Sequence, residues 1–251
     1  MPFSDHEKTD FGFHKIYKVE KNKLIYTIFH SVSKKYDIMN DIASFGLHRI
    51  WKYLTVKVSN ICYGEHVLDI AGGTGDLTIQ LAKKVGKSGK VILADINDAM
   101  LHIGRKKIRN LGIINNVSYL LTNAEELPFI DNYFDCIHIS FGLRNITDKN
   151  IALKSMYRVL KPGGRLIILE FSKPYSLLLS KCYDIYSFYF LPYIGKLITN
   201  DFDSYRYLVE SIRMHPDQKQ LKNIIESNGF QEVSYTNISG GIVAIHKAYK
   251  F

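Results

Sequence analysis

The residues best suited to chemistry lie in one short stretch, VLDIAGGTGD, at residues 67–76. An apolar run there contains Asp69 and is followed by Gly73, Thr74 and Gly75. Glycines after a strand allow a tight turn, and they let backbone N–H groups approach a ligand at the start of the next helix. The stretch therefore predicts a loop that binds a nucleotide-like cofactor, with a tight turn that binds nothing as the alternative.

The spacing within this loop separates two kinds of cofactor. A dinucleotide fingerprint needs a third small residue after the paired glycines, and Thr78 stands at that position. The alternative pattern is an acidic residue followed by small residues at alternate positions, which Asp69, Ala71, Gly73 and Gly75 satisfy. The loop thus favours S-adenosylmethionine (SAM) over a dinucleotide.

Polar and small residues also follow the next predicted strands. Asp95 closes the second strand, where a carboxylate can accept hydrogen bonds from both ribose hydroxyls. The alternative role for Asp95 is to cap the following helix, for which Asn97 is equally suited. Asn123 and Ala124 follow the third strand, at the expected adenine edge, and Ser140 ends the fourth strand at the same crevice. We predict that all four contact the cofactor.

Alternating apolar runs and amphipathic segments determine the expected scaffold. Strands are predicted at 66–70, 90–95, 117–121, 134–140, 165–171, 230–237 and 242–249, and helices at 76–85, 97–111, 148–160 and 217–229. Strands and helices in alternation predict an α/β fold whose parallel sheet is covered on both faces. The turn ISGG is too short for a crossover, so the last two strands must pair as an antiparallel hairpin. Seven strands with this ending are typical of Rossmann-like class I SAM-dependent methyltransferases. The order of the strands is not determined by the sequence.

Two segments stand outside this pattern. Residues 1–60 contain FHSVSKKYDIMNDIASFGLHRIWKYL, which predicts two helices ahead of the sheet. An insertion at 172–211 is aromatic, with ten Tyr or Phe among the 33 residues from 175 to 207. We expect both to cap the carboxyl ends of the strands within a single methyltransferase domain, residues 1–251.

Composition limits the partners and the compartment. The formal charge is +9, but 25 of the 33 basic residues are Lys, so no Arg-rich stripe indicates nucleic acid. Cys62, Cys136 and Cys182 are far apart, which favours reduced thiols in a cytoplasmic protein. No spacing of His and Cys suggests a metal site. The sequence contains neither a secretory signal nor a run of about 20 apolar residues.

Several longer motifs resemble one family. The UbiE family of ubiquinone/menaquinone biosynthesis C-methyltransferases is similar in order and spacing to VLDIAGGTGD, VILADIN, NAEELPF, ISFGLRN, YRVLKPGGRL, SYRYLVESIRMHPDQ, FHSVSKKYDIMND and AIHKAYKF. The resemblance covers nearly the whole chain. It implies methylation of a polyprenylated quinol by SAM: of demethylmenaquinol to menaquinol, and of 2-methoxy-6-polyprenyl-1,4-benzoquinol to its methylated product. The family's cofactor contacts would fall on Thr74, Asp95, Asn123, Ala124 and Ser140.

This chemistry needs an activated ring carbon, so the substrate should be the quinol and not the quinone. A phenol titrates near about 10, and the site must remove its proton or stabilise the phenolate. Arg144 is the first catalytic candidate because its charge is permanent, and pairing with Asp148 is its alternative role. Tyr205 is the second, with a place in the core as its alternative. Weaker candidates are Asn145, Arg206 and His215. His215 and Pro216 could instead simply start the helix that follows them.

The aromatic insertion suggests an apolar groove for the polyprenyl tail, and peripheral contact with the inner membrane is a hypothesis. The sequence allows a homodimer or an assembly with other quinone-biosynthesis enzymes. It determines neither the length of the tail nor the choice between benzoquinols and naphthoquinols. Three other functions remain as alternatives. They are methylation of another small lipid or phenol, methylation of nucleic acid, and dinucleotide-dependent oxidation. SFGL in place of an Asp/Asn-Pro-Pro-aromatic loop disfavours the second.

Overall fold

The computed structural model describes residues 7–199 and 202–251, and its elements run in the following order. The N-terminal part holds β1 (Lys8–Phe11), β2 (His14–Tyr17), α1 (Lys18–Val32), the 3-10 helix η1 (Ser33–Lys35), α2 (Tyr36–Ala43) and α3 (Leu47–Val58). The central part holds β3 (His66–Ile70), α4 (Asp76–Val85), β4 (Lys90–Asp95), α5 (Asp98–Asn110), β5 (Val117–Leu121), β6 (Phe134–Ser140), η2 (Leu143–Asn145), α6 (Lys149–Val159) and β7 (Leu160–Phe171). The last part holds α7 (Leu177–Ile185), the π-helix η3 (Tyr186–Phe190), α8 (Leu191–Thr199), α9 (Phe202–Met214), α10 (Gln218–Ser227), β8 (Gln231–Ile238), η4 (Ser239–Gly241) and β9 (Val243–Tyr249).

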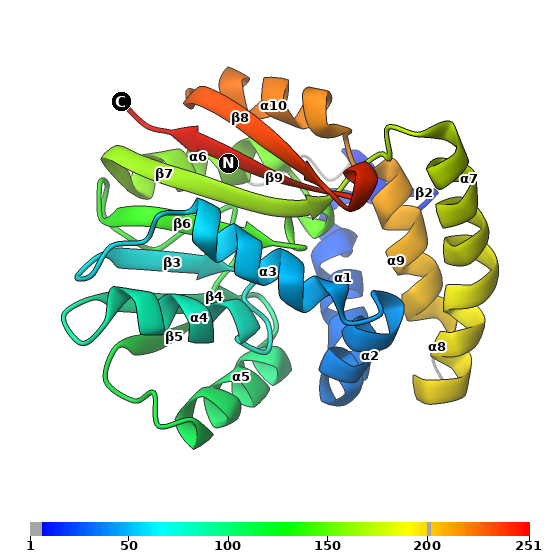
Figure 1. Cartoon of the computed structure of the whole chain (residues 1–251), viewed down its shortest axis with the longest axis horizontal. Helices are drawn as coiled ribbons and strands as arrows, with labels where there is room; N and C mark the ends of the chain where they lie inside the picture. The colour runs from blue at the N-terminus through cyan, green and yellow to red at the C-terminus, as the bar shows by residue number, and fades with distance from the viewer. Residues whose placement is uncertain (1–6, 200–201) are drawn as a thin grey trace.

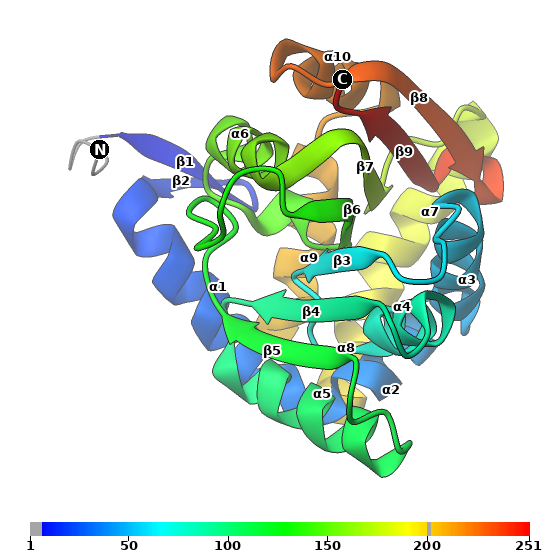
Figure 2. The ribbon, with the colours of Figure 1, turned by 90° about the vertical axis from the view of Figure 1, so that its left-hand side faces the viewer.

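The main sheet has the strand order β5-β4-β3-β6-β7-β9-β8. Only β9 runs antiparallel, pairing with β7 on one side and β8 on the other, as the predicted hairpin requires (Figures 1 and 2). The chain moves outward from β3 to β4 and β5, then returns to β6 on the other side of β3. Such a reversal leaves a crevice beyond the carboxyl ends of the two central strands, where ligands bind in open α/β sheets.

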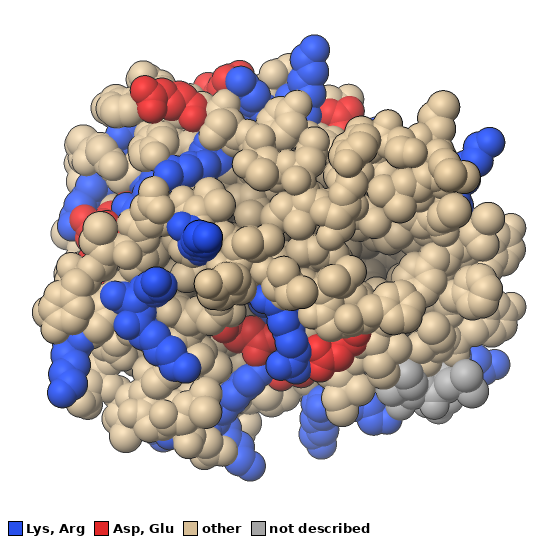
Figure 3. Space-filling view, viewed as in Figure 1, with Lys and Arg blue, Asp and Glu red and all other residues tan. Residues whose placement is uncertain are grey.

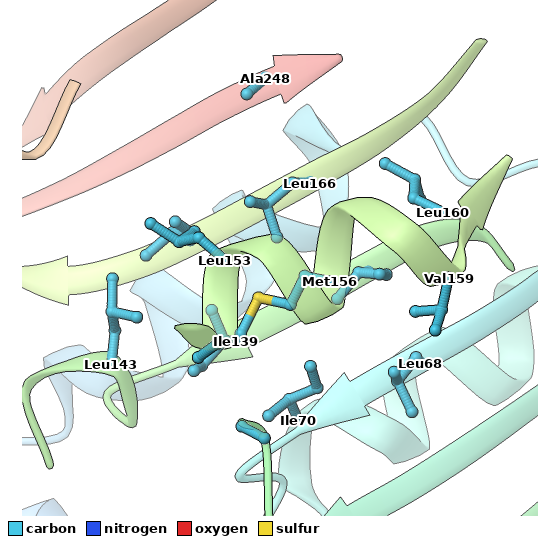
Figure 4. Close-up of a cluster of buried hydrophobic side chains, with 14 of the residues drawn as sticks. Leu68, Ile70, Ile139, Leu143, Leu153, Met156, Val159, Leu160, Leu166 and Ala248 are labelled. Carbon is cyan, nitrogen blue, oxygen red and sulfur yellow. The ribbon is translucent and has the colours of Figure 1, made fainter. Parts of the chain in front are cut away.

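Alternate residues of the central strands pack into two cores on opposite faces of the sheet. Leu68 and Ile70 face the layer formed with α6 and α10 (Figure 4), whereas Val67 faces the layer formed with α3, α4 and α5. All three side chains are at most 3% exposed. Burial of each contributes about 1.5–3 kcal/mol. This apolar packing on both faces confirms the predicted layers and fixes the positions of the strand ends.

The N-terminal segment differs from the expected pair of helices. It contains three α-helices and, ahead of them, the hairpin of β1 and β2, which turns at Gly12 with φ +57°. The hairpin is held by a residue far along the chain, because the Phe11 ring stacks on Tyr207 of α9 with the ring centres 4.5 Å apart. A break at Phe45 and Gly46, both with positive φ, separates α2 from α3. Residues 1–6 of the predicted cap lie outside the described residues.

The aromatic insertion forms helices α7 to α9 and extends to Met214, three residues beyond the predicted end. Its helices stand beside α1 and α2 at the carboxyl ends of the strands (Figure 1). We call α1–α3 the N-terminal cap and α7–α9 the aromatic cap. Residues 200–201 of the predicted insertion lie outside the described residues. Within the described ranges, no helix has the length and apolarity needed to cross a membrane.

The fifth strand begins earlier than expected. The sequence predicts a turn at KPGG and a strand from Arg165, but β7 already starts at Leu160, which pairs with Phe134. The register then shifts, so that Cys136 pairs with Arg165. Gly163, with φ +77°, allows the extra residues to bulge within one strand.

Candidate functional site

Two cavities lie on either side of the glycine loop, where β3, β4 and β6 end. The β4-side cavity is lined by Asn22, Ile25, Phe29, Tyr36, Ile70, Ala71, Gly73, Asp95, Ile96, Met100, Thr122, Asn123, Ala124, Glu125, Phe141, Gly142, Asn145 and Ile146. The α3-side cavity is lined by Tyr36, Asn40, Ala43, Ser44, His48, Trp51, Lys52, Asp69, Ala71, Gly72, Gly73, Thr74, Leu77, Ser140, Phe141, Arg144, Phe171, Tyr183, Leu191, Leu208 and Ile212. The cavity volume is about 90 Å³ on the β4 side and about 70 Å³ on the α3 side.

The β4-side cavity brings together the residues predicted to bind a nucleoside. Asp95 accepts hydrogen bonds from the backbone N–H groups of Gly73 and Asn97, each at 2.9 Å. Asn123 and Ala124 line the same wall. Asn97 caps α5 by accepting from Met100 N at 3.1 Å, so Asp95 is not needed as the helix cap. Burial raises the pKa of Asp95 to about 6, and its carboxylate keeps lone pairs that can accept from hydroxyls.

The loop between the cavities depends on its glycines for different reasons. Gly73 and Gly75 have φ of +55° and +81°, a region that L side chains rarely adopt. A Cβ at Gly75 would lie 2.8 Å from Ile108 Cδ1, whereas a Cβ at Gly73 would meet open space. Gly73 therefore exposes backbone to both cavities. Gly75 lines neither cavity and instead allows α4 and α5 to pack closely.

The backbone is strained where the two cavities meet. Ala71, after β3, and Phe141, after β6, both have positive φ, at 52° and 56°. A Cβ at Gly142 would lie only 2.5 Å from Ala71 Cβ, so the two loops touch. Non-glycine residues in this region cost about 1–3 kcal/mol each, and such strain clusters at ligand sites.

The predicted residues Asp69, Thr74 and Ser140 line the α3-side cavity. Asp69 is fully buried and accepts from Thr78 Oγ1 at 2.5 Å, and burial raises its pKa to about 7. Its Oδ1 and the Ser140 hydroxyl have no hydrogen-bond partner within the described part of the chain. Buried polar atoms are normally paired, so both are available to a bound ligand.

Arg144, on η2, is held in the wall of the α3-side cavity by a buried ion pair. Its Nη1 lies 2.8 Å from Glu170 Oε1 and also donates to Phe141 O at 2.5 Å. The backbone N–H of Arg144 donates to the other Glu170 oxygen at 3.2 Å. Its guanidinium lies 5.3 Å from the centre of the Phe171 ring. The Arg144 Nε is buried and has no partner among the described residues, so this donor remains for a ligand.

The partner of Arg144 is therefore Glu170 and not Asp148, the alternative that the sequence suggested. Asp148 instead caps α6 and pairs with Lys18 at 3.0 Å. Sequence reasoning missed Glu170, although a carboxylate within the apolar run RLIILEF was a signal. It also missed His48, which lines the same cavity.

The second catalytic candidate, Tyr205, lies outside both cavities. Tyr205 is 1% exposed, belongs to a small core with Val32, Met39 and Met100, and lines neither cavity. Its catalytic role stays a prediction that this placement does not favour.

The three weaker candidates differ in their positions. Arg206 is exposed and pairs with Glu210 at 2.8 Å, and His215 is buried outside both cavities. The helix after Pro216 is capped by Asp217 through a capping box. Asn145 lines the β4-side cavity and accepts from Tyr207 Oη at 3.0 Å.

The character of the cavities differs. Much of the α3-side wall is aromatic or aliphatic, with Trp51, Phe141, Phe171, Tyr183, Leu191 and Leu208. A flat apolar ring therefore suits this side, and a nucleoside suits the β4 side. No group of three His, Cys, Asp or Glu side chains in residues 7–199 and 202–251 is arranged to hold a metal ion.

Comparison with known proteins identifies the family and the fold. The model of the ubiE/COQ5 methyltransferase family matches residues 17–250. The ubiquinone/menaquinone biosynthesis C-methyltransferase UbiE of Proteus mirabilis (strain HI4320) is 62% identical over 245 residues, which cover 98% of each chain. Its counterpart in Escherichia coli O1:K1 / APEC is 60% identical over the same length and coverage. A SAM-dependent methyltransferase from Aquifex aeolicus has the same fold, with a TM-score of 0.63 at 19% identity, covering 86% of this chain and 98% of that one.

Proposed function

The chain belongs to the ubiE/COQ5 methyltransferase family and is a C-methyltransferase of ubiquinone and menaquinone biosynthesis; we propose that it transfers the methyl group of SAM to a ring carbon of a polyprenylated quinol. One observation about the site supports this proposal. A cavity with a ribose-type carboxylate meets an aromatic cavity with a buried Arg, and the glycine loop lies between them.

The residues at the loop fit SAM. Asp95 would accept from the ribose hydroxyls, and Asn123 and Ala124 would border the adenine. The free Oδ1 of Asp69 and the Ser140 hydroxyl face the other cavity, where the charged methionine end of SAM can supply partners. When bound, SAM supplies a strongly electrophilic methyl group that needs no activation by the protein.

The chain must instead activate the acceptor. Loss of a hydroxyl proton makes the neighbouring ring carbon nucleophilic. The Arg144 Nε–H, which has no partner among the described residues, would stabilise the resulting oxyanion. The pair with Glu170 fixes the guanidinium, so the donor is oriented before the substrate arrives. Further rate enhancement comes from holding the ring carbon in line with the methyl group between the two cavities.

The test is methyl transfer from labelled SAM to demethylmenaquinol and to 2-methoxy-6-polyprenyl-1,4-benzoquinol, each offered reduced and oxidised. We expect transfer to the reduced forms alone, because a quinone has no ionisable ring hydroxyl. Equal transfer to the oxidised forms would refute the mechanism. Transfer to RNA or DNA that is indifferent to added quinol would refute the substrate assignment.

We propose that the enzyme is cytoplasmic and that it meets its substrate at the inner membrane. The aromatic cap and the turn before it expose a group of apolar side chains, here called the apolar cap surface: Tyr175, Leu177, Leu178, Ile185, Tyr189, Phe190 and Tyr193. Figure 3 shows few charged side chains over this part of the molecule. Such a surface, beside a cavity for a tailed quinol, suits peripheral contact with lipid.

A further inference from the structure

His48 and Asp41 form a hydrogen-bonded pair on adjacent helices at the wall of the α3-side cavity. The imidazole Nε2 lies 2.8 Å from Asp41 Oδ1, and the break between α2 and α3 brings the two together. His48 is only 4% exposed and lines the cavity that also holds Arg144.

The contacts of Asp41 determine which ring nitrogen carries the proton. Two hydrogen bonds from Arg49, at 2.7 and 2.8 Å, hold the pKa of Asp41 well below its usual range, and the bond with His48 adds to this effect. An ionised carboxylate can only accept, so Nε2 of His48 must donate to it. In the neutral ring, the lone pair is therefore on Nδ1.

Nδ1 of His48 is buried and has no hydrogen-bond partner within the described residues. A buried acceptor without a partner is uncommon in folded proteins. Because His48 lines the α3-side cavity, the natural partner for Nδ1 is a donor on the molecule that occupies this cavity.

We propose that His48 is the general base that takes the hydroxyl proton of the quinol, with Asp41 as the residue that positions it. This proposal rests on the proposed function. It divides the work within one cavity, since Nδ1 accepts the proton and Arg144 stabilises the oxyanion that remains. Such a positioned base contributes about 10²–10⁴-fold to the rate.

The proton and electron balance closes with the groups already named. The hydroxyl O–H bond breaks and its proton passes to Nδ1. The ring carbon then bonds to the methyl group, while the electron pair of the broken S–C bond stays on sulfur. The resulting dienone loses its ring C–H proton to solvent as the imidazolium returns its own proton to the oxygen. The ring becomes aromatic again, one proton is released in total, and His48 is neutral for the next turnover.

Neutral His48 is favoured by its surroundings. Burial lowers its pKa, Lys52 on α3 lowers it further, and Asp41 together with Asp76 on α4 opposes these effects. Asp69, Arg144 and Tyr183 line the same cavity. The pH profile of activity should therefore have an acidic limb, in which activity rises with pH as Nδ1 loses its proton and becomes free to accept. This limb should lie below the usual pKa range of His.

The test compares the wild-type enzyme with H48Q and with H102Q, the same change at an exposed His that lines neither cavity. We expect kcat to fall 10²–10⁴-fold in H48Q, while the Kd of S-adenosylhomocysteine in calorimetry stays within about threefold. The limb set by His48, which levels off below the usual His range, should be lost from the pH profile and be replaced by a rise that continues to higher pH. Activity should recover about tenfold per pH unit toward the pKa of the quinol, about 10.

Asp69 and Asp95 also titrate near neutrality, so the limb is assigned by its loss in H48Q and its retention in H102Q. A kcat of H48Q within about threefold of wild type, or an unchanged limb, would overturn the proposal. A second variant, D41N, removes the negative charge that raises the pKa of His48. We expect its limb to move to lower pH and its kcat to fall.

A limb that does not move in D41N would remove Asp41 from the proposal. If the wild-type enzyme methylates neither quinol, the proposed function fails. If it methylates them and H48Q does so equally well, only the assignment of the base fails.

Discussion

Asp69 and Asp95 are carboxylates that the fold keeps from water at two neighbouring strand ends. Their pKa values are raised by burial, to about 7 and about 6, whereas an unfolded Asp titrates near about 3.9. The folded protein therefore binds these protons more tightly than the unfolded chain. Stability must therefore fall as pH rises from the pKa of the unfolded Asp to the higher pKa that each Asp has in the folded protein. This loss is a cost of keeping ionised groups at the ligand site.

The Asp69→Asn substitution removes one of these costs. We expect the variant to gain free energy of unfolding relative to wild type, by less at about pH 5 than at about pH 8, because only the wild-type residue must ionise while buried. Urea unfolding at both values measures this gain. Asp135→Asn is the control, because hydrogen bonds from Lys161 and His66 outweigh burial and lower the pKa of Asp135, so its contribution has the opposite sign. A gain for Asp69→Asn that does not change with pH would contradict the assigned cause.

Arg144 offers a test of orientation as distinct from charge. In Arg144→Lys the positive charge remains, but the Nε–H that faces no described partner is lost. We expect kcat to fall about 10²–10³-fold, the usual effect of removing one donor to a developing oxyanion. Binding of S-adenosylhomocysteine should change little. Arg158→Lys, at a surface pair with Asp131, should leave kcat unaltered. An undiminished kcat in Arg144→Lys would show that charge alone suffices.

At the scale of elements, a chain of polar contacts joins four helices at the glycine loop. Thr74 donates to Asp37 of α2 at 2.6 Å, and Lys107 of α5 pairs with Asp37 at 2.7 Å and also with Asp76 of α4. Asp76 in turn pairs with Lys52 of α3 at 2.9 Å. The N-terminal cap is thus tied to both helices that flank the cofactor loop.

Lys107→Met should loosen this tie. Because hydrogen bonds to charged groups contribute about 1.5–3 kcal/mol, S-adenosylhomocysteine should dissociate about tenfold faster. Amide hydrogens of α2 should also exchange faster. Lys106→Met, an exposed neighbour on α5, is the matched control and should change neither quantity. Equal dissociation rates in the two variants would mean that the cap does not retain the ligand.

The sequence predicts those elements whose stabilising contacts are local, and it does not predict those that depend on contacts with residues far along the chain. The strands at 66–70, 90–95 and 134–140 are found at the predicted residues, because apolar runs that end in turns carry the signal locally. The hairpin of β1 and β2 could not be predicted, since its strands KTDF and HKIY are largely polar and depend on the Phe11–Tyr207 contact.

The residues of the site also differ in whether the sequence alone could predict them. Asp95 was found from its spacing after the loop. Glu170 and His48 were not, because their importance depends on Arg144 and Asp41, which come near them only in the folded chain.

At the scale of the whole molecule, charge and apolar surface are distributed unequally. In the view of Figure 3, Lys and Arg are most frequent over the sheet half, and the surface over α7 and α8 is nearly free of them. The apolar cap surface includes Leu177 and Leu178, which are 83% and 74% exposed. An unpartnered surface of this kind costs solubility unless it meets lipid or protein.

The double substitution Leu177→Glu/Leu178→Glu tests the lipid contact. We expect wild type to float with liposomes that contain anionic lipid at low salt and the variant to remain in solution, since each carboxylate opposes insertion and is repelled by the lipid. The kcat/KM for a long-tailed quinol presented in liposomes should fall about tenfold or more, whereas that for a short-tailed, water-soluble quinol should be unchanged, because the reacting groups lie in the cavities beneath. Ile130→Glu alters an equally exposed apolar residue, at 73%, on the loop before β6, and should float as wild type does. If wild type fails to float with or without quinol, or if Ile130→Glu loses binding equally, the apolar cap surface does not provide a specific membrane contact.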